Sequence, residues 1–141
     1  MIRIDTREQE NKHIAQAFDA LGVEYDTTKP LIVGDYMSIN APNVFIERKN
    51  SWLEFAGNCG KGHNTFKREL ERLDQTGGKM YLLVEETTPL EKWRNRCGQM
   101  KGVVMQKILS AWLTKHNIEL VQCHPSDTPR KILEILKEVQ K

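Results

Sequence analysis

The stretch LIVGDYMSINAPNVFIERK, residues 31–49, decides how the rest of this 141-residue chain is interpreted. It contains two β-prone runs, residues 31–39 and 44–49, on either side of the turn-forming sequence Asn40-Ala41-Pro42-Asn43. Turn residues between two such runs predict a β-hairpin. Charged residues interrupt both runs, so the hairpin is also the first candidate for a catalytic or metal-binding site.

The charges of this hairpin are Asp35 in the first run and Glu47, Arg48 and Lys49 at the end of the second. Residues two apart on a strand face the same side, so Glu47 and Lys49 project together and Arg48 projects away. An aspartate inside an apolar run is costly unless it is paired or bound to a metal. Two carboxylates beside a lysine suit a hard cation such as Mg²⁺, and phosphodiester hydrolysis needs such a cation and a group that orients water.

Each of these motifs also has a purely structural interpretation. Glu47 and Lys49 are compatible with a solvated strand face, and Gly34-Asp35 is compatible with a turn or bulge. A four-residue loop at 40–43 would place Asp35 opposite Arg48, on the wrong face for a shared site. A common site for Asp35 and Glu47 therefore requires a one-residue irregularity, either a bulge near Gly34 or a different loop length, and we predict one.

The sequence Asp5-Thr6-Arg7-Glu8 follows a predicted first strand over residues 1–5. Strand ends are where α/β sheets build their sites, so Asp5 is a third candidate carboxylate and Arg7 a candidate phosphate clamp. The alternative is that Asp5 caps the following helix and Glu8 completes a capping box. The helix itself is indicated by apolar residues at helical spacing and ends at Gly22.

The remaining pattern alternates helices and strands, with a short strand near 23–27 following the first helix. We predict helices over 51–74, interrupted by a glycine-rich loop at 57–63, and over 103–115 and 129–139; the predicted strands are 80–84, taken as the central one, and 118–122. This order favours a single α/β domain over residues 1–141, with a central mixed β-sheet flanked by helices and an early β-hairpin that carries the active site.

Composition narrows the class of protein. No stretch has the roughly 20 apolar residues that cross a bilayer and no signal peptide is recognisable, so we expect no membrane contact and a cytoplasmic location. Three widely spaced cysteines do not form a disulfide framework, and a zinc site from Cys59, His63, Cys123 and His124 is an alternative without the usual C-x-x-C spacing.

The formal net charge is only +2, but basic residues are grouped. One group comprises Lys92, Arg94, Arg96, Lys101 and Lys107, and the other Lys61, Lys67, Arg68 and Arg72. Such groups attract phosphates, although solvated helix faces have the same composition.

The three motifs in order, Ile4-Asp5-Thr6-Arg7-Glu8, Gly34-Asp35-Tyr36 and Ile46-Glu47-Arg48-Lys49, resemble the nuclease domain of the XPF family of structure-specific endonucleases. The signature of that family is G-D followed at short distance by E-R-K. The resemblance extends into Glu54-Phe55-Ala56-Gly57 and Phe66-Lys67-Arg68-Glu69-Leu70.

The resemblance implies a restriction-endonuclease-like core, Mg²⁺ or Mn²⁺ as cofactor, and incision of flapped, forked or otherwise branched DNA in repair, recombination or replication. By position, Asp5, Asp35 and Glu47 would hold the metal and Lys49 would serve the attacking water. Glu8, Arg7 and Arg48 would support the site or the phosphates, and Tyr36 would be a further phosphate contact.

Two departures from the family pattern stand out. The family has an acid four residues after the motif lysine, but this chain has Leu53 there and Glu54 one residue later. The family's tandem helix-hairpin-helix DNA-binding domain has no counterpart, so we expect affinity for DNA to need a homodimer or a protein partner. The apolar faces of the last two helices are the candidate dimer surfaces, and a prokaryotic or viral source, with the protein near a nucleoid or in an infected cell, fits a compact nuclease domain.

Two other functions remain open from the sequence. One is a non-catalytic DNA-binding or scaffold subunit of a nuclease complex. The other is a sequence-specific restriction-type nuclease on the same fold. Cleavage assays on flap, fork and linear DNA distinguish the three.

Overall fold

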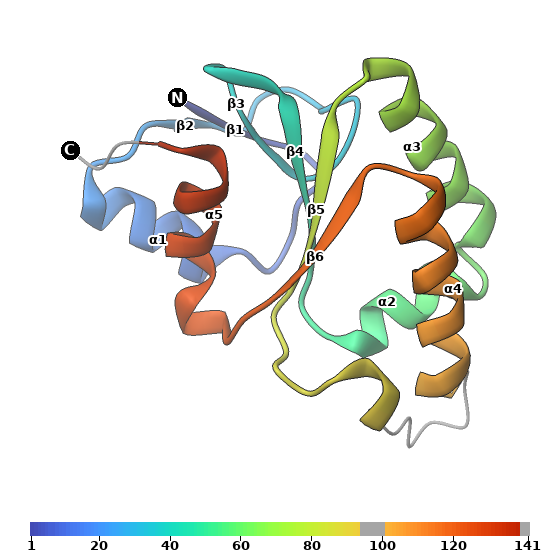
Figure 1. Cartoon of the computed structure of the whole chain (residues 1–141). Coiled ribbons are helices and arrows are strands. Elements are labelled where there is room, and N and C mark those ends of the chain that lie inside the picture. Colours follow the sequence, from blue (N-terminus) through green and yellow to red (C-terminus); the bar gives the residue numbers. More distant parts are fainter. Residues whose placement is uncertain (94–100, 139–141) are drawn as a thin grey trace.

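The computed structural model describes residues 1–93 and 101–138, and the strands of this part form one mixed sheet (Figure 1). The strand order is β2-β1-β3-β4-β5-β6, with bounds β1 (Ile2–Ile4), β2 (Tyr25–Asp26), β3 (Tyr36–Ser38), β4 (Ala41–Lys49), β5 (Lys79–Val84) and β6 (Ile118–Gln122). All pairs are parallel except those of β3, which is antiparallel to β1 and to β4. The expected mixed sheet is confirmed.

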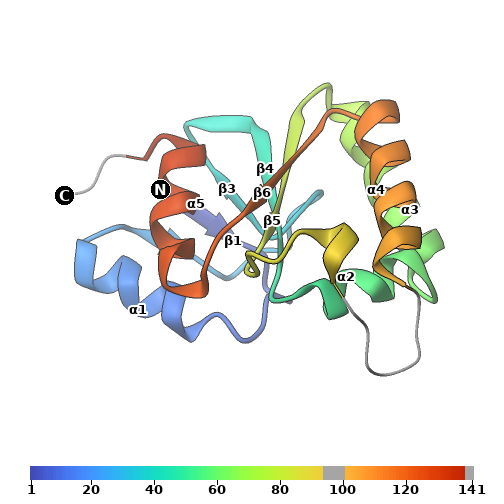
Figure 2. The same cartoon turned by 60° about the horizontal axis from the view of Figure 1, so that its bottom comes forward.

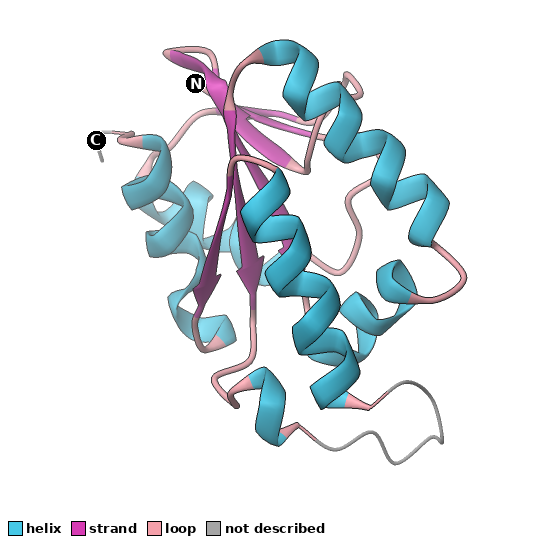
Figure 3. Ribbon diagram, turned by 45° about the vertical axis from the view of Figure 1, so that its right-hand side comes forward, coloured by secondary structure: helices cyan, strands magenta, loops and turns pink. Residues whose placement is uncertain are grey.

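Helices cover both faces of the sheet (Figures 2 and 3). On one face lie α1 (Lys12–Leu21) and α5 (Thr128–Leu136), the latter preceded by the short 3₁₀ helix η2 (Pro125–Asp127). On the other face lie α2 (Trp52–Cys59), α3 (His63–Thr76), α4 (Gly102–Lys115) and the 3₁₀ helix η1 (Leu90–Lys92). Among the described residues, no helix is both long and apolar enough to traverse a bilayer.

Two apolar clusters fill the space between the sheet and these layers. Because side chains alternate along a strand, β4 sends Phe45 to the cluster beneath α2, α3 and α4, and Ile46 to the cluster beneath α1 and α5. In the same way β5 sends Leu82 to the first cluster and Leu83 to the second. Strands buried on both faces explain why 80–84 is a continuous apolar run.

The strand directions bring charged residues to one edge of the sheet. Because β1, β4 and β5 run the same way, their carboxyl ends share an edge, where Asp5 follows β1, Lys49 ends β4 and Glu85 follows β5. Strand β3 runs the opposite way, so Asp35, just before it, lies at the same edge. The topology thus gathers three distant parts of the sequence.

The hairpin between β3 and β4 has the predicted irregularity but a different turn. Tyr36 pairs with Ile46 and Ser38 with Ala41, with a register shift between the two pairs. The chain turns at residues 39–40, and Ala41 and Pro42 belong to β4, so the predicted turn at 40–43 was wrong. The pairing of Tyr36 with Ile46 sets the preceding residue, Asp35, level with Glu47 and thereby resolves the conflict of register.

Other expectations need smaller corrections. The predicted strand 31–39 is regular only over β3, because residues 32–35 bend, and the strand 80–84 lies between β4 and β6 rather than at the centre. Helix α1 begins at Lys12, so Asp5 does not cap it, and α5 ends at Leu136, while the predicted end at Val139 lies outside the described residues.

The apolar faces of the last two helices are used within the chain. Met105 and Leu109 of α4 pack into one core cluster, and Ile132 and Leu133 of α5 into the other. These faces are therefore not free for a dimer, contrary to the expectation. The exposed apolar side chains of α4 are Val103 and Val104, at 56% and 43% exposure.

Gly34 is required by the bend before Asp35. Its φ of 73° is in the left-handed region, and a Cβ at this position would lie 2.7 Å from the carbonyl oxygen of Ile46. A side chain would therefore push β3 away from β4 at the point where Asp35 joins the sheet.

We predict that Gly34→Ala destabilises the fold more than Gly77→Ala. Gly77 has a similar φ of 69°, but a Cβ at this position would meet nothing within 4 Å, so its replacement carries only the left-handed penalty of about 1 kcal/mol. Gly34→Ala adds the clash with Ile46, and we expect a total of roughly 2–4 kcal/mol. Urea unfolding of both variants measures the difference, and equal losses would contradict the close-approach argument.

Candidate metal-binding and nuclease site

Glu47 and Lys49 project from β4 toward α3 and form a buried ion pair. The Nζ atom of Lys49 lies 3.0 Å from Oε2 of Glu47 and 5.8 Å from the ring centre of Phe66. Burial acts to lower the pKa of Lys49, but the charge of Glu47 and its hydrogen bond outweigh this and raise it. Lys49 is therefore charged at neutral pH.

Asp35 is held at this face by backbone hydrogen bonds. Its amide donates to the Ile46 carbonyl at 2.7 Å, its carbonyl accepts from the Asp5 amide at 2.8 Å, and its Oδ2 accepts from the Arg48 amide at 2.8 Å. Burial, the charges of Glu47 and Glu8, and a hydrogen bond with the Glu47 side chain hold its pKa well above the usual range. The structure thus brings Asp35 and Glu47 together as carboxyl groups that repel each other.

Asp5 lies beside this pair but is occupied by Arg7. The guanidinium of Arg7 donates to both carboxylate oxygens, at 3.1 and 2.8 Å, and the Arg7 amide donates to Oδ1 at 2.9 Å. Burial raises the pKa of Asp5, but these bonds and one from the Leu31 amide lower it overall. Asp5 as a metal ligand stays a prediction, and it requires Arg7 to release the carboxylate.

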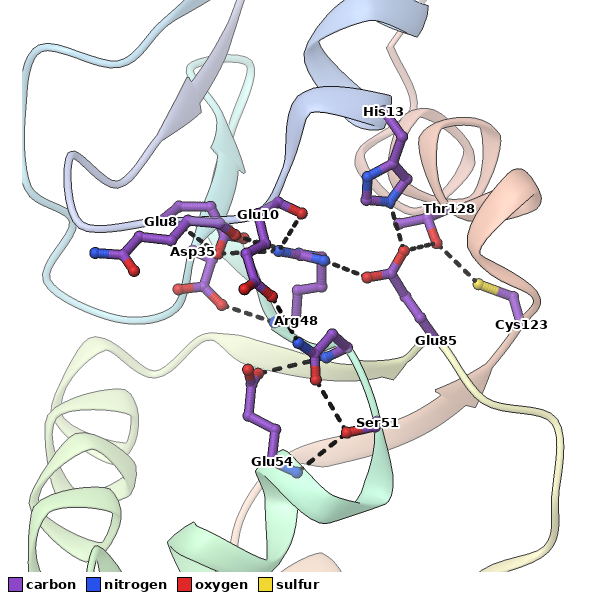
Figure 4. A network of polar contacts seen from close by, with 12 residues as sticks. Glu8, Glu10, His13, Asp35, Arg48, Ser51, Glu54, Glu85, Cys123 and Thr128 are labelled. Atoms are coloured by element: carbon purple, nitrogen blue, oxygen red, sulfur yellow. Dashed lines mark hydrogen bonds and ion pairs between the residues drawn. The ribbon is translucent and has the colours of Figure 1, made fainter.

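Arg48 projects to the opposite face of the sheet, as the strand alternation predicted (Figure 4). Its Nε donates to Glu8 Oε2 at 3.0 Å and its Nη1 pairs with Glu85, while Nη2 donates to the Gln9 carbonyl at 2.7 Å. Arg48 is 5% exposed, so its guanidinium supports the segment that carries Asp5 to Glu8 rather than reaching a phosphate from solvent.

Glu85 completes this second network. Its Oε2 accepts from Thr128 Oγ1 at 2.7 Å and contacts His13 Nε2 at 2.7 Å (Figure 4). Burial raises the pKa of Glu85, but these partners and Arg48 lower it overall, so the carboxyl remains charged. Because Thr128 begins α5 and His13 lies on α1, the network connects both helices of this face to β4.

Two acids of this region were missed by the sequence analysis as site residues. Glu69 of α3 is partly buried and accepts a hydrogen bond from the Gly34 amide at 2.9 Å, and burial and the charge of Glu47 raise its pKa to about 7. The signal for Glu69 is its spacing from Phe66 and Leu73, which places it on the buried face of an amphipathic helix. The signal for Glu85 is its place directly after an apolar strand.

The other predicted residues lie as follows. Tyr36 is fully buried in the core beneath α1 and α5, so the prediction that it contacts phosphate is wrong for this conformation. The basic residues Lys61, Lys67, Arg68 and Lys92 are exposed, as a phosphate contact requires. Arg94 and Arg96 lie outside the described residues.

Glu54, the acid that lies one residue later than in the family pattern, has a structural role at the start of α2. Ser51 caps α2 by accepting the Glu54 amide at 3.2 Å, and Glu54 Oε1 accepts the Asn50 amide at 3.4 Å. Its charge also raises the pKa of Lys49, after the larger effects described above. Glu54 therefore influences the site electrostatically while it stabilises the start of the helix.

Comparison with known families decides where this arrangement belongs. The ERCC4 domain family matches residues 4–136, which include all three motifs. The chain belongs to the ERCC4 domain family. This membership confirms the XPF-type resemblance seen in the sequence. No curated protein matches the chain by sequence.

A solved structure has the same fold as this ERCC4 domain. The match to XPF from Aeropyrum pernix has a TM-score of 0.71 at 21% identity and covers 96% of this chain and 59% of that one. The chain therefore spans about three fifths of the archaeal protein's chain, and the likeness at this identity establishes the fold.

The donor set of the ERCC4 domain can be tested against a divalent cation. Among the residues that the structure describes, no cluster of three or more His, Cys, Asp or Glu side chains is arranged to hold a metal ion. The alternative zinc site is thereby excluded for this conformation, since Cys59 and Cys123 also lie in different core clusters. The predicted set of Asp5, Asp35 and Glu47 is not assembled as a trio either.

The pair of Asp35 and Glu47 nevertheless fits Mg²⁺ or Mn²⁺. Mg²⁺ is usually bound by one or two carboxylates together with substrate phosphates and water, rather than by a cage of protein ligands. Burial is the main cause of the raised pKa of Asp35 and the charge of Glu47 adds to it, and a cation between the two carboxyl groups would offset that repulsion.

We predict that Arg48→Met strongly destabilises the protein. Removal of the guanidinium leaves the buried carboxylates of Glu8 and Glu85 without the arginine that they share, which costs about 3–5 kcal/mol. Lys79→Met is the control, because Lys79 forms an exposed pair with Glu119 and should cost less than about 1 kcal/mol.

The loss caused by Arg48→Met should depend on pH. Because the folded-state pKa of Glu85 is lowered, its contribution to stability is present above the unfolded pKa of about 4.5 and is lost as pH falls. The penalty of the variant should therefore be larger at pH 7 than at pH 4, in urea unfolding at both values. A penalty that is the same at both pH values would contradict the charge argument.

Proposed function

We propose that this chain is an endodeoxyribonuclease that requires Mg²⁺ or Mn²⁺ and hydrolyses phosphodiester bonds in branched, flapped or forked DNA. The observation that carries the proposal is the convergence of Asp35, Glu47 and Lys49 on one face of the hairpin, in a chain of the ERCC4 domain family. A role in repair, recombination or replication is part of the same proposal.

In this proposal Asp35 and Glu47 would hold the cation, which would supply charge stabilisation to the phosphoryl oxygens and help to activate the attacking water. Lys49 exchanges its contact with Glu47 for one with the attacking water. Its charge, sustained by Glu47 and Asp35, favours a hydroxide-like nucleophile next to it. Glu47, released by Lys49, would then contact the cation.

Arg7 is the group on this edge best placed to meet a phosphate. Its side chain is 75% exposed although it holds Asp5. It lines an open pocket with three acids, Glu8, Glu10 and Glu54, and with Gln9, Asn50, Ser51 and Leu53. Among these described residues Arg7 is the cation that a phosphate would meet. A phosphate that draws the guanidinium away frees the Asp5 carboxylate to join Asp35 and Glu47. Substrate binding would in this way complete the predicted trio of carboxylates.

Affinity for DNA is proposed to come from basic residues outside this pocket. Lys61, Lys67 and Arg68 are exposed at the start of α3, the helix that packs behind Lys49. With a net charge of only +2, the domain needs further help to hold a polyanion, which a second copy or a protein partner would supply.

One observation favours a second candidate, a non-catalytic DNA-binding or scaffold subunit. Both Glu47 and Asp5 are engaged by cationic side chains in this conformation. In that case the ion pairs would be permanent features, and the chain would bind branched DNA without cutting it.

Lys49→Ala separates the two candidates. The unaltered protein should cut flap or fork DNA with Mg²⁺ or Mn²⁺ and not with EDTA, and the variant should lose at least about a hundredfold in rate, as expected when the partner of the attacking water is lost. Binding of the same DNA should change by less than about threefold. Lys79→Ala, at the opposite end of the parallel strands, should cut normally.

Unaltered cutting by Lys49→Ala would remove Lys49 from the proposed role. Absence of cleavage by the unaltered protein on flap, fork and linear DNA with either metal would favour the scaffold subunit. Cleavage of linear duplex at fixed sites would indicate a restriction-type nuclease.

Binding of Mn²⁺ can be measured without DNA. A ligand that binds the folded state raises the melting temperature to an extent set by its concentration relative to its dissociation constant. We expect millimolar Mn²⁺ to stabilise the protein and to have little effect on Asp35→Asn. The same substitution should stabilise the metal-free protein at pH 8, because it removes a carboxyl whose pKa is raised in the folded state. Equal shifts by Mn²⁺ in both proteins would contradict the assigned ligand.

A further inference from the structure

Helix α3 holds the segment before Asp35 at two points. Glu69 Oε1 accepts from the Gly34 amide at 2.9 Å, and Arg72 Nε donates to the Ile32 carbonyl at 3.0 Å. Residues three apart lie on the same side of a helix, so both side chains reach the same segment. The bend that leads into the hairpin is therefore attached to a helix as well as to the sheet.

The Gly34 amide donates to the Glu69 side chain because the hydrogen bonds between this segment and β4 begin one residue later. The first bond from this segment to β4 is made by the Asp35 amide, which donates to the Ile46 carbonyl. Gly34 is buried, has a left-handed φ of 73°, and donates its amide hydrogen to Glu69. A buried amide without an acceptor is unfavourable, so loss of the Glu69 oxygen would favour a different conformation of the bend.

A change of the bend would be transmitted to Asp35. Asp35 is the next residue, and three of its polar groups are fixed to Ile46, Asp5 and Arg48. A shift of Gly34 would therefore alter where the Asp35 carboxyl lies relative to Glu47.

We propose that Glu69 is a positioning residue of the nuclease site, which holds the Gly34 turn through its side-chain oxygen and so sets Asp35 beside Glu47. The activity part of this inference rests on the proposed function, whereas the hydrogen bond does not. The reach of the side chain matters for this role, and its charge does not.

Reach and charge can be separated by two conservative variants. Glu69→Gln keeps an oxygen at the same distance from the helix and removes the charge, whereas Glu69→Asp keeps the charge and is one methylene group shorter. Both are small changes on a helix with its own buried apolar residues, so both proteins should fold. Glu71, an exposed acid on the same helix, provides the control variant Glu71→Asp.

Amide hydrogen exchange of the metal-free protein is the first measurement. We expect exchange at Gly34 in Glu69→Gln and Glu71→Asp to stay within about threefold of the unaltered protein, and to rise at least tenfold in Glu69→Asp. Exchange at Leu82 in β5 should be the same in all four proteins. Unchanged exchange at Gly34 in Glu69→Asp would overturn the proposal.

Cleavage of fork DNA is the second measurement. Glu69→Asp should lower kcat at least tenfold with KM within about twofold, and Glu69→Gln should stay near the unaltered protein. The opposite order, an active Asp variant and an inactive Gln variant, would overturn the positioning role and assign one to the charge. If the unaltered protein does not cut DNA, the proposed function fails, and the exchange data alone decide whether Glu69 holds the turn.

Discussion

Burial of charge at the end of β4 is the constraint on which the rest of the structure depends. Glu47, Arg48 and Lys49 are all less than 9% exposed, although a buried charge is costly without a partner. Alternation along the strand distributes them over two faces of the sheet. Lys49 meets Glu47 on the face of α3, and Arg48 meets Glu8 and Glu85 on the face of α1 and α5.

These two faces have different electrostatic balances. On the Arg48 face Glu8 and Glu85 share the Arg48 guanidinium, and Thr128 and His13 add hydrogen bonds to Glu85, so this face is suited to support. On the Lys49 face Asp35, Glu47 and Glu69 lie together, Lys49 pairs with Glu47, and the pKa values of Asp35 and Glu69 are raised. In the proposed function, a cation bound at this face would offset the repulsion among these carboxyl groups.

The elements of the fold and the main acids of the site were predictable from local patterns. Apolar runs and helical spacing predicted β5, β6, α4 and both parts of the helical region 51–74, and Ser51 and Gly22 marked helix ends correctly. The register conflict at the hairpin was also visible, because two residues on opposite faces cannot share a site. The family motifs then predicted that Asp35, Glu47 and Lys49 belong to one nuclease site.

What the sequence did not reveal depends on contacts between distant segments. The turn lies at residues 39–40 because Ala41 pairs with Ser38 of β3, which places residues 41–43 within β4. Glu69 and Glu85 gain their importance from Gly34 and Arg48, which are far from them in sequence. Asp5 binds Arg7 in this structure, although the sequence also allowed it to be a metal ligand. Residue types alone cannot decide between these two partners, because the outcome depends on the positions of the side chains.

A crystal structure with Mn²⁺, with the ion located by its anomalous scattering, tests the central claim most directly. The account predicts one peak in contact with both Asp35 and Glu47, at the carboxyl edge of β4. A peak bound elsewhere, or none at a concentration that saturates related sites, would contradict the claim that this edge of the sheet is a metal centre.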